Sequence, residues 1–144
     1  MNLYLDTSSL IKLCVCEAGS EAVVDAVDEA AVVVTSTIAY AETRAALARL
    51  RRERALTASL FAAAKREFEE QWPAYLTIEV TPALCRTAGD LAEHYRLRGF
   101  DSVHLASFGE VASVAGPRNV RFSSFDDRLN RAAQAVARTL ARAR

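Results

Sequence analysis

Four short segments rich in apolar and β-branched residues constrain the fold more than any other feature of this chain. They lie at residues 2–6, 31–35, 76–80 and 120–125. The long stretches between them have the apolar periodicity of amphipathic helices. Strands that alternate with helices form parallel sheets, and right-handed crossovers place the helices on both faces. The sequence therefore predicts an α/β fold with a central parallel sheet.

Capping residues and helix breakers predict where the helices begin and end. Gly19 is expected to stop the first helix, and Ser20 to cap the second. Pro82 suits the first turn of a later helix, and Asp101 is expected to open the one after it. The expected helices span residues 7–18, 20–29, 36 or 37 to 52, 57–72, 82–97, 101–114, and 126 or 127 to the C-terminus.

Length and composition indicate one soluble domain over residues 1–144. Apolar residues make up 51% of the chain and charged residues 25%, as in ordinary globular proteins. No apolar stretch reaches the length of a membrane span, and the N-terminus does not resemble a signal peptide. Three cysteines without a disulfide framework indicate reduced thiols. We therefore expect a cytoplasmic protein with no membrane contact.

Basic residues are unevenly distributed, although the formal net charge is zero. Sixteen of the 18 basic residues are arginines, and one group falls within a single expected helix and the turn after it. Arginine suits both phosphate contacts and salt-bridged helix surfaces, and a solvated helix face is the more common case. The members of this group that could contact nucleic acid or a partner protein are Arg44, Arg49, Arg51 and Arg52.

Four acidic residues are the candidates for a functional site. Asp6 and Asp126 directly follow the first and last strand segments, and ligands bind beyond the carboxyl ends of parallel strands. Asp101 begins a new helical segment. Glu42 lies on the apolar side of its helix, where burial is costly unless the carboxylate is paired or bound. For the three aspartates, a helix N-cap is an equally good interpretation.

A pocket of four carboxylates is unstable unless it is protonated or holds divalent cations. Mg²⁺ prefers oxygen ligands and can bind substrate phosphate, so this set of residues favours metal-dependent phosphate chemistry. Other enzyme classes fit less well. The chain has Ser8 where an aspartyl phosphatase has a second aspartate. It has no glycine-rich turn after the first strand and no nucleophile elbow. His94 and His104 are the two histidines, and His104 is expected to be a packed or surface residue rather than a catalytic one.

Four segments, in order and with matching spacing, resemble PIN domains, and within that group the VapC-type toxin ribonucleases. They are Leu3-Tyr4-Leu5-Asp6-Thr7-Ser8-Ser9-Leu10-Ile11-Lys12, Ser36-Thr37-Ile38-Ala39-Tyr40-Ala41-Glu42, Gly99-Phe100-Asp101-Ser102-Val103-His104-Leu105-Ala106 and Phe122-Ser123-Ser124-Phe125-Asp126-Asp127-Arg128-Leu129. The resemblance covers nearly the whole chain. It implies a three-layer α/β/α sandwich with a central, mainly parallel sheet of four to five strands.

The resemblance also implies an activity, namely Mg²⁺- or Mn²⁺-dependent endonucleolytic cleavage of RNA. It maps the acids of the family onto Asp6, Glu42, Asp101 and Asp126. Thr7 and Ser124 match hydroxyl positions near the metal, and Asp127 is a second candidate for the fourth acid. A homodimer and a cognate VapB-type antitoxin are implied as partners. The alternatives are a PIN nuclease that processes RNA without an antitoxin, and a non-catalytic binding module whose acids are caps and salt-bridge partners.

Overall fold

The computed structural model describes residues 1–143, in which four short strands form one parallel sheet. The strands are β1 (Asn2–Leu5), β2 (Val32–Ser36), β3 (Leu76–Ile78) and β4 (Val120–Ser123). Their order in the sheet is β3-β2-β1-β4, and all three pairings are parallel. The four predicted strands are thereby confirmed. No fifth strand is present in the described residues.

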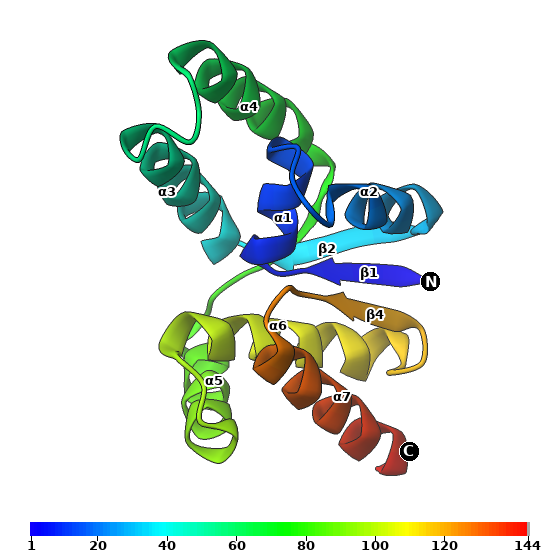
Figure 1. The fold of residues 1–144 in the computed structure, drawn as a ribbon. Coiled ribbons are helices and arrows are strands. Elements are labelled where there is room, and N and C mark those ends of the chain that lie inside the picture. Colours follow the sequence, from blue (N-terminus) through cyan, green and yellow to red (C-terminus); the bar gives the residue numbers. More distant parts are fainter. Residues whose placement is uncertain (144) are drawn as a thin grey trace.

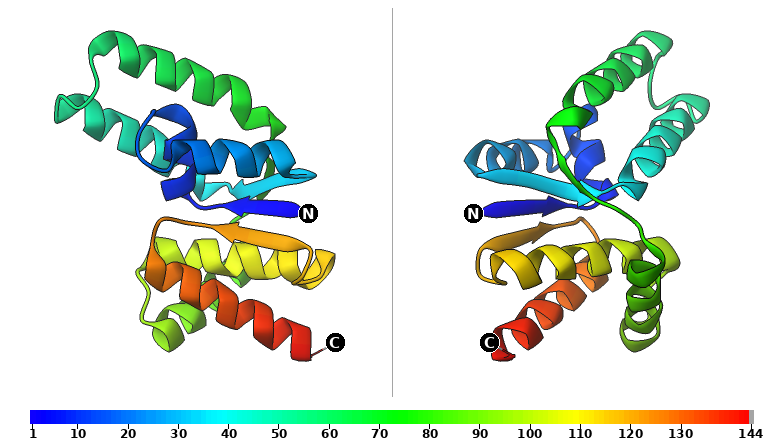
Figure 2. Two further views of the ribbon diagram at one scale, coloured as in Figure 1. Left: turned by 45° about the vertical axis from the view of Figure 1, so that its right-hand side comes forward. Right: turned by 180° about the vertical axis from the view of Figure 1, so that it is seen from behind.

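Helices cover both faces of this sheet and complete a three-layer α/β/α arrangement (Figures 1 and 2). The helices α1 to α4 lie on one side and α5 to α7 on the other, as both views of Figure 2 show. Their bounds are α1 Thr7–Cys14, α2 Ser20–Glu29, α3 Ile38–Arg52, α4 Ala58–Gln71, α5 Pro82–Tyr95, α6 Gly99–Ala115 and α7 Asp127–Arg142, with a short 3₁₀ turn, η1, at Trp72–Ala74. The predicted fold class is therefore confirmed.

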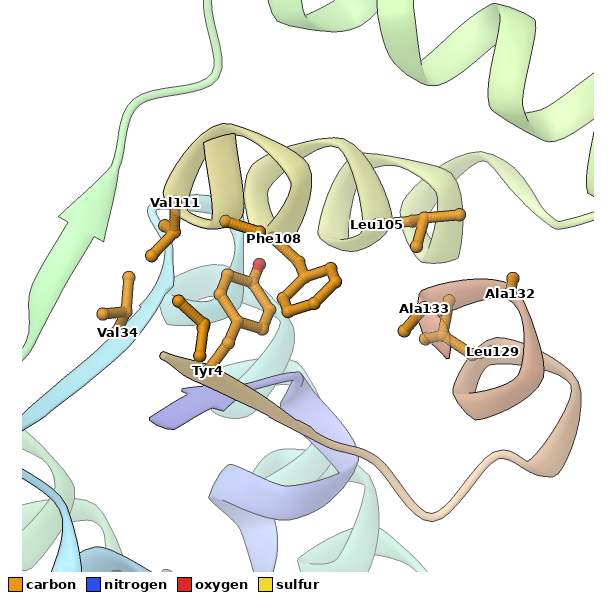
Figure 3. Packing of buried hydrophobic residues seen from close by; sticks show 10 residues of the cluster. Tyr4, Val34, Leu105, Phe108, Val111, Leu129, Ala132 and Ala133 are labelled. Carbon is orange, nitrogen blue, oxygen red and sulfur yellow. The ribbon is translucent and has the colours of Figure 1, made fainter. Parts of the chain in front are cut away.

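The central strand β1 divides the core between the two layers, because successive side chains of a strand point to opposite faces. Leu3 and Leu5 pack with residues of α1 and α2. Tyr4, which is fully buried, points the other way and packs with Phe108 and Leu105 of α6 (Figure 3). One four-residue strand thus fixes the position of both helical layers, and with them the chain that follows at Asp6.

Two predicted helix boundaries were wrong. The first helix ends at Cys14, not near residue 18, because Val15 takes up an extended conformation. Gly19, which has φ +92°, directly precedes α2, and Ser20 is the first helical residue rather than its cap. The Ser20 hydroxyl donates to the Val15 carbonyl at 3.0 Å, which stabilises the tight connection.

The second error concerns the start of α6, which begins at Gly99 rather than at Asp101. The backbone N–H of Ser102 donates to the Arg98 carbonyl, and this bond closes the first turn two residues earlier than predicted. Asp101 therefore lies inside the first turn and is not an N-cap. Among the described residues, no helix is long and apolar enough to cross a bilayer.

Parallel pairing sends the carboxyl ends of β1 and β4 to the same edge of the sheet. This edge lies on the left of Figure 1, where α1, α3, α6 and α7 begin. The predicted site residues after β1 and β4 therefore lie together, as we expected from the pattern. Leu5 pairs in register with Ser123, so Asp6 and Ser124 are neighbours across the two strands.

We expect Gly19→Ala to destabilise the protein by about 1–2 kcal/mol, because the left-handed conformation disfavours a Cβ atom. The added Cβ would also lie 2.6 Å from the Phe125 ring. Gly89→Ala is the matched control. At Gly89, which lies within α5, a Cβ meets nothing within 4 Å, and helix propensity should stabilise the variant by about 0.5–1 kcal/mol. Urea unfolding measures the stability of both variants. Equal effects of the two substitutions would contradict the left-handed conformation and close packing of Gly19.

Candidate active site

Asp6 is a buried carboxylate at the carboxyl end of β1, with only 4% of its surface exposed. Its Oδ1 accepts hydrogen bonds from the Ser9 backbone N–H at 3.0 Å and the Ser8 hydroxyl at 2.7 Å. Its Oδ2 accepts from the Ser124 hydroxyl at 2.5 Å. The bond from Ser9 makes Asp6 the N-cap of α1. The capping interpretation of Asp6 is therefore correct, and it is compatible with a further role for Oδ2.

All three donors to Asp6 are neutral, and no basic side chain of residues 1–143 bonds to it. Burial raises the pKa of Asp6 above its ordinary value, and the hydrogen bonds from Ser124, Ser8 and Ser9 offset this only in part. A buried carboxylate without a counter-charge is costly. Asp6 therefore favours the binding of a cation.

Glu42 comes from α3 and is partly buried, with 23% of its side chain exposed. Its Oε1 accepts from the Thr7 hydroxyl at 2.7 Å and from Nε2 of His104 at 2.8 Å. Burial alone would raise the pKa of Glu42, but the hydrogen bonds from His104 and Thr7 outweigh it and leave the pKa below its ordinary value. The sequence placed Glu42 on an inward face without a partner, and the structure supplies that partner from α6.

His104 is the functional neighbour that sequence reasoning missed. It is packed, as predicted, with 2% of its surface exposed, but its ring lies between Glu42 and the hydroxyl of Tyr4. The Tyr4 hydroxyl lies 3.0 Å from Nδ1. Ionised Glu42 can only accept, so in the neutral imidazole Nε2 carries the proton and Tyr4 donates to Nδ1. The available signal was the spacing of three residues between Asp101 and His104, which places both on one side of a helix.

Asp101 and Asp126 complete the acidic set. Asp101 accepts from Nε of Arg98 at 3.0 Å through Oδ2. Asp126 caps α7, because its Oδ1 accepts from the Leu129 backbone N–H at 3.0 Å. Both line a cavity of about 510 Å³, and Asp101 also lines a groove of about 620 Å³ that it shares with Glu42. Asp101 therefore lines both the groove that contains Glu42 and the cavity that contains Asp126.

Arg98 contacts Asp101 and lines both cavities. The hydrogen bond to Asp101 is the main cause of its raised pKa, and the charges of Asp126 and Glu42 add to it. Asp126 and Asp127 both line the smaller cavity, and Asp127 is the more exposed of the two. Asp126 stays the predicted fourth acid, with Asp127 as the alternative.

The chemistry of these residues fits a divalent cation, since all four acids offer carboxylate oxygens, which Mg²⁺ and Mn²⁺ prefer. In the described residues, however, no three acidic, histidine or cysteine side chains converge closely enough to hold an ion as they stand. Hydrogen bonds to hydroxyls, to His104 and to Arg98 currently occupy the acids. Binding a shared ion therefore requires their side chains to turn toward one another.

The arginines of α3 lie further along the helix than Glu42 and are partly occupied. Arg44 forms an ion pair with Glu69 of α4 at 2.5 Å, and Arg49 lies 4.0 Å from Glu53. Arg51 donates to the Leu56 carbonyl, while Arg52 is exposed. The salt-bridged surface that the composition suggested is present at Arg44. Contact of Arg44, Arg49, Arg51 and Arg52 with RNA or an antitoxin stays a prediction.

Comparison with known families agrees with this geometry. The sequence model of the PIN domain matches residues 3–135. The chain belongs to the PIN-domain family. Two curated relatives from Mycobacterium tuberculosis are each 37% identical to it over 134 residues, which is 93% of this chain and 90% of theirs. They are ribonuclease VapC45 from strain CDC 1551 / Oshkosh and ribonuclease VapC49 from strain ATCC 25618 / H37Rv. The predicted resemblance to VapC-type PIN ribonucleases is thereby confirmed.

We expect Asp6→Asn to raise the melting temperature of this PIN domain without metal. The pKa of Asp6 is higher in the folded than in the unfolded protein. Asp6 therefore contributes less to stability as the pH rises above its unfolded pKa and through its folded pKa. At neutral pH the asparagine amide carries no charge, so the variant avoids the cost of burying a charged carboxylate. A gain of about 1 kcal/mol in unfolding free energy corresponds to a rise of about 2–4 °C in melting temperature. Calorimetry with EDTA measures the change, and added Mn²⁺ should then stabilise the wild type more than the variant. A lower melting temperature for the variant would contradict an uncompensated charge at Asp6.

We expect His104→Leu to raise the pKa of Glu42 above its ordinary value, because burial remains while the main donor is lost. In the wild type the pKa of Glu42 is lower in the folded than in the unfolded protein. Ionised Glu42 therefore stabilises the fold at pH values above its unfolded pKa, and this contribution is lost as the pH falls through its folded pKa. In the variant the pKa of Glu42 is raised instead, so ionised Glu42 destabilises the fold. The loss of unfolding free energy relative to the wild type should therefore grow from pH 4 to pH 7 and reach about 1–3 kcal/mol. Urea unfolding across this range checks the result. His94→Leu on α5 is the control, and a pH-independent loss would count against the coupling.

Proposed function

We propose that this PIN domain is a Mg²⁺- or Mn²⁺-dependent endoribonuclease that acts as the toxin of a toxin–antitoxin pair. The observation that carries the proposal is the buried Asp6 carboxylate at the carboxyl end of β1, to which only neutral donors bond within residues 1–143. Glu42, Asp101 and Asp126 line the two cavities described above. The ribonuclease names of the two relatives support RNA as the substrate.

The acids divide into two roles in this proposal. Asp6, Asp101 and Asp126 hold the cation directly or through water, and Glu42 binds the same cluster or orients the attacking water. The chemistry that a divalent cation supplies in such a site is polarisation of a phosphate oxygen and activation of water. Asp127 lies one residue beyond Asp126 and lines the same cavity, where it adds negative charge.

The surrounding side chains hold these acids in place. Ser8 and Ser124 fix the two oxygens of Asp6, and Thr7 together with His104 fixes Oε1 of Glu42. Because the bonds from Thr7 and His104 lower the pKa of Glu42, its carboxylate stays ionised near neutral pH, as a cation-binding or water-orienting group requires. In this proposal Thr7 and Ser124 are positioning residues. The family resemblance matches both to hydroxyl positions near the metal.

The proposed partners follow from the VapC resemblance. A VapB-type antitoxin would block the acidic pocket, and a basic side chain is the complementary group for Glu42, Asp101 and Asp126. The exposed Arg52 and its neighbours on α3 offer a second contact for the antitoxin or for RNA. We further propose that the protein is a cytoplasmic homodimer.

The test is cleavage of total RNA by purified protein with Mn²⁺ or Mg²⁺, compared with EDTA. We expect discrete fragments that disappear with EDTA and fall at least about 100-fold in Asp6→Asn and Glu42→Gln, since even outer-shell partners of metal ligands are worth about 10–100-fold. Asp28→Asn, an exposed acid on α2, is the matched control and should cleave normally. All proteins are purified identically.

Equal cleavage by the wild type and Asp6→Asn would contradict the proposal and indicate a contaminating nuclease. Absence of cleavage with either metal would favour a non-catalytic binding module. Cleavage that needs Asp6 and metal, from a chain that binds no antitoxin and does not slow growth when expressed, would instead favour an RNA-processing nuclease.

A further inference from the structure

The groove beside Glu42 and Asp101 has a volume of about 620 Å³. It runs between α5 and α6, which pack against each other below the sheet (Figure 1). Apart from the two acids and Arg98, much of its lining is apolar or small, with Ala88 and Ala92 on the α5 side. The cleavage mechanism gives this part of the groove no role.

Phe100 forms part of the groove and is 61% exposed. It lies in the first turn of α6, directly before Asp101. The core therefore gains little from this ring. An exposed aromatic ring beside a phosphate-cleaving site is a suitable stacking platform, because every base has a flat π-face.

Gly89 provides a second, independent observation. It lies within α5, where glycine lowers helix stability relative to alanine. Its φ is not positive, and an added Cβ would meet nothing within 4 Å, so neither backbone conformation nor packing within the chain explains the glycine. Gly89 lines the groove, and its missing side chain leaves that space free for a ligand.

Charge identifies the kind of ligand. Arg98 lies at the groove with 84% of its side chain exposed, and its Nε donates to Asp101 at 3.0 Å. A ligand with a flat apolar part for Phe100 and an anionic part for Arg98 matches this lining. A nucleotide of single-stranded RNA has both parts.

We propose that the groove between α5 and α6 binds the base of the nucleotide next to the cleaved phosphodiester, stacked on Phe100 in the space that Gly89 leaves open. This inference rests on the proposed ribonuclease function. It names the part of the chain that engages a base, whereas the acids engage only the phosphate.

The test measures binding separately from cleavage. A fluorescently labelled random-sequence RNA decamer is titrated against Asp6→Asn protein, and binding is followed by anisotropy. Adding Phe100→Ala or Gly89→Leu should weaken binding about 5- to 150-fold, the range for one stacked base, whereas Phe100→Trp should retain it. The salt dependence should stay unchanged in Phe100→Ala, because stacking releases no counterions. Melting temperatures confirm that each variant is folded.

Binding as tight as that of the parent in both Phe100→Ala and Gly89→Leu would overturn the inference. Loss of binding to a co-purified antitoxin, with RNA binding intact, would also overturn it and assign the groove to a peptide. Failure of the nuclease itself gives a different result. The total-RNA assay would then show no cleavage dependent on Asp6, while decamer binding that is sensitive to Phe100 and Gly89 would still establish a base-binding groove.

Discussion

The buried negative charge of Asp6 is the constraint on which the rest of the site depends. The chain delivers this carboxylate to the end of β1 and surrounds it with Ser8, Ser9 and Ser124. These bonds join β1, α1 and the segment after β4, so the same group that caps a helix also connects two strands. Hydrogen bonds from neutral donors do not fully compensate a buried charge, as the raised pKa of Asp6 shows. The fold therefore maintains an unfavourable group at the point where a cation would relieve it.

A second network holds the other half of the site across the sheet. Glu42 belongs to the layer of α1 to α4, and His104 to the layer of α5 to α7 (Figure 1). A 2.8 Å hydrogen bond joins the two residues. Thr7, which lies just after the carboxyl end of β1, also donates to Glu42. The Tyr4 hydroxyl lies 3.0 Å from the other ring nitrogen of His104, Nδ1, within the core. Packing of α6 on the sheet thus sets the position of Glu42, although Glu42 itself lies on α3.

Local patterns in the sequence were sufficient to predict the strands, the layer order and the placement of Asp6 and Asp126. Parallel strands leave their carboxyl ends at one edge, so residues that follow them are neighbours whatever the loops between them do. The boundaries at Cys14 and Gly99 were less predictable, because Val15 and Arg98 determine them through contacts and backbone conformation rather than through an obvious breaker. His104 could not be assigned to Glu42 because the pair is 62 residues apart. Exposure of Phe100 and the open space at Gly89 likewise appear only once α5 and α6 are packed together.

Anomalous X-ray diffraction from crystals grown with MnCl₂ would test the central claim most directly, namely that the four acids form one cation site. The account predicts an anomalous peak at the carboxyl end of β1, within coordination distance of Asp6 and at least one of Glu42, Asp101 and Asp126, with their side chains turned toward it. The peak should be absent from Asp6→Asn crystals grown in the same way. A fully occupied Mn²⁺ elsewhere, with Asp6 still bonded only to its three serines, would contradict it.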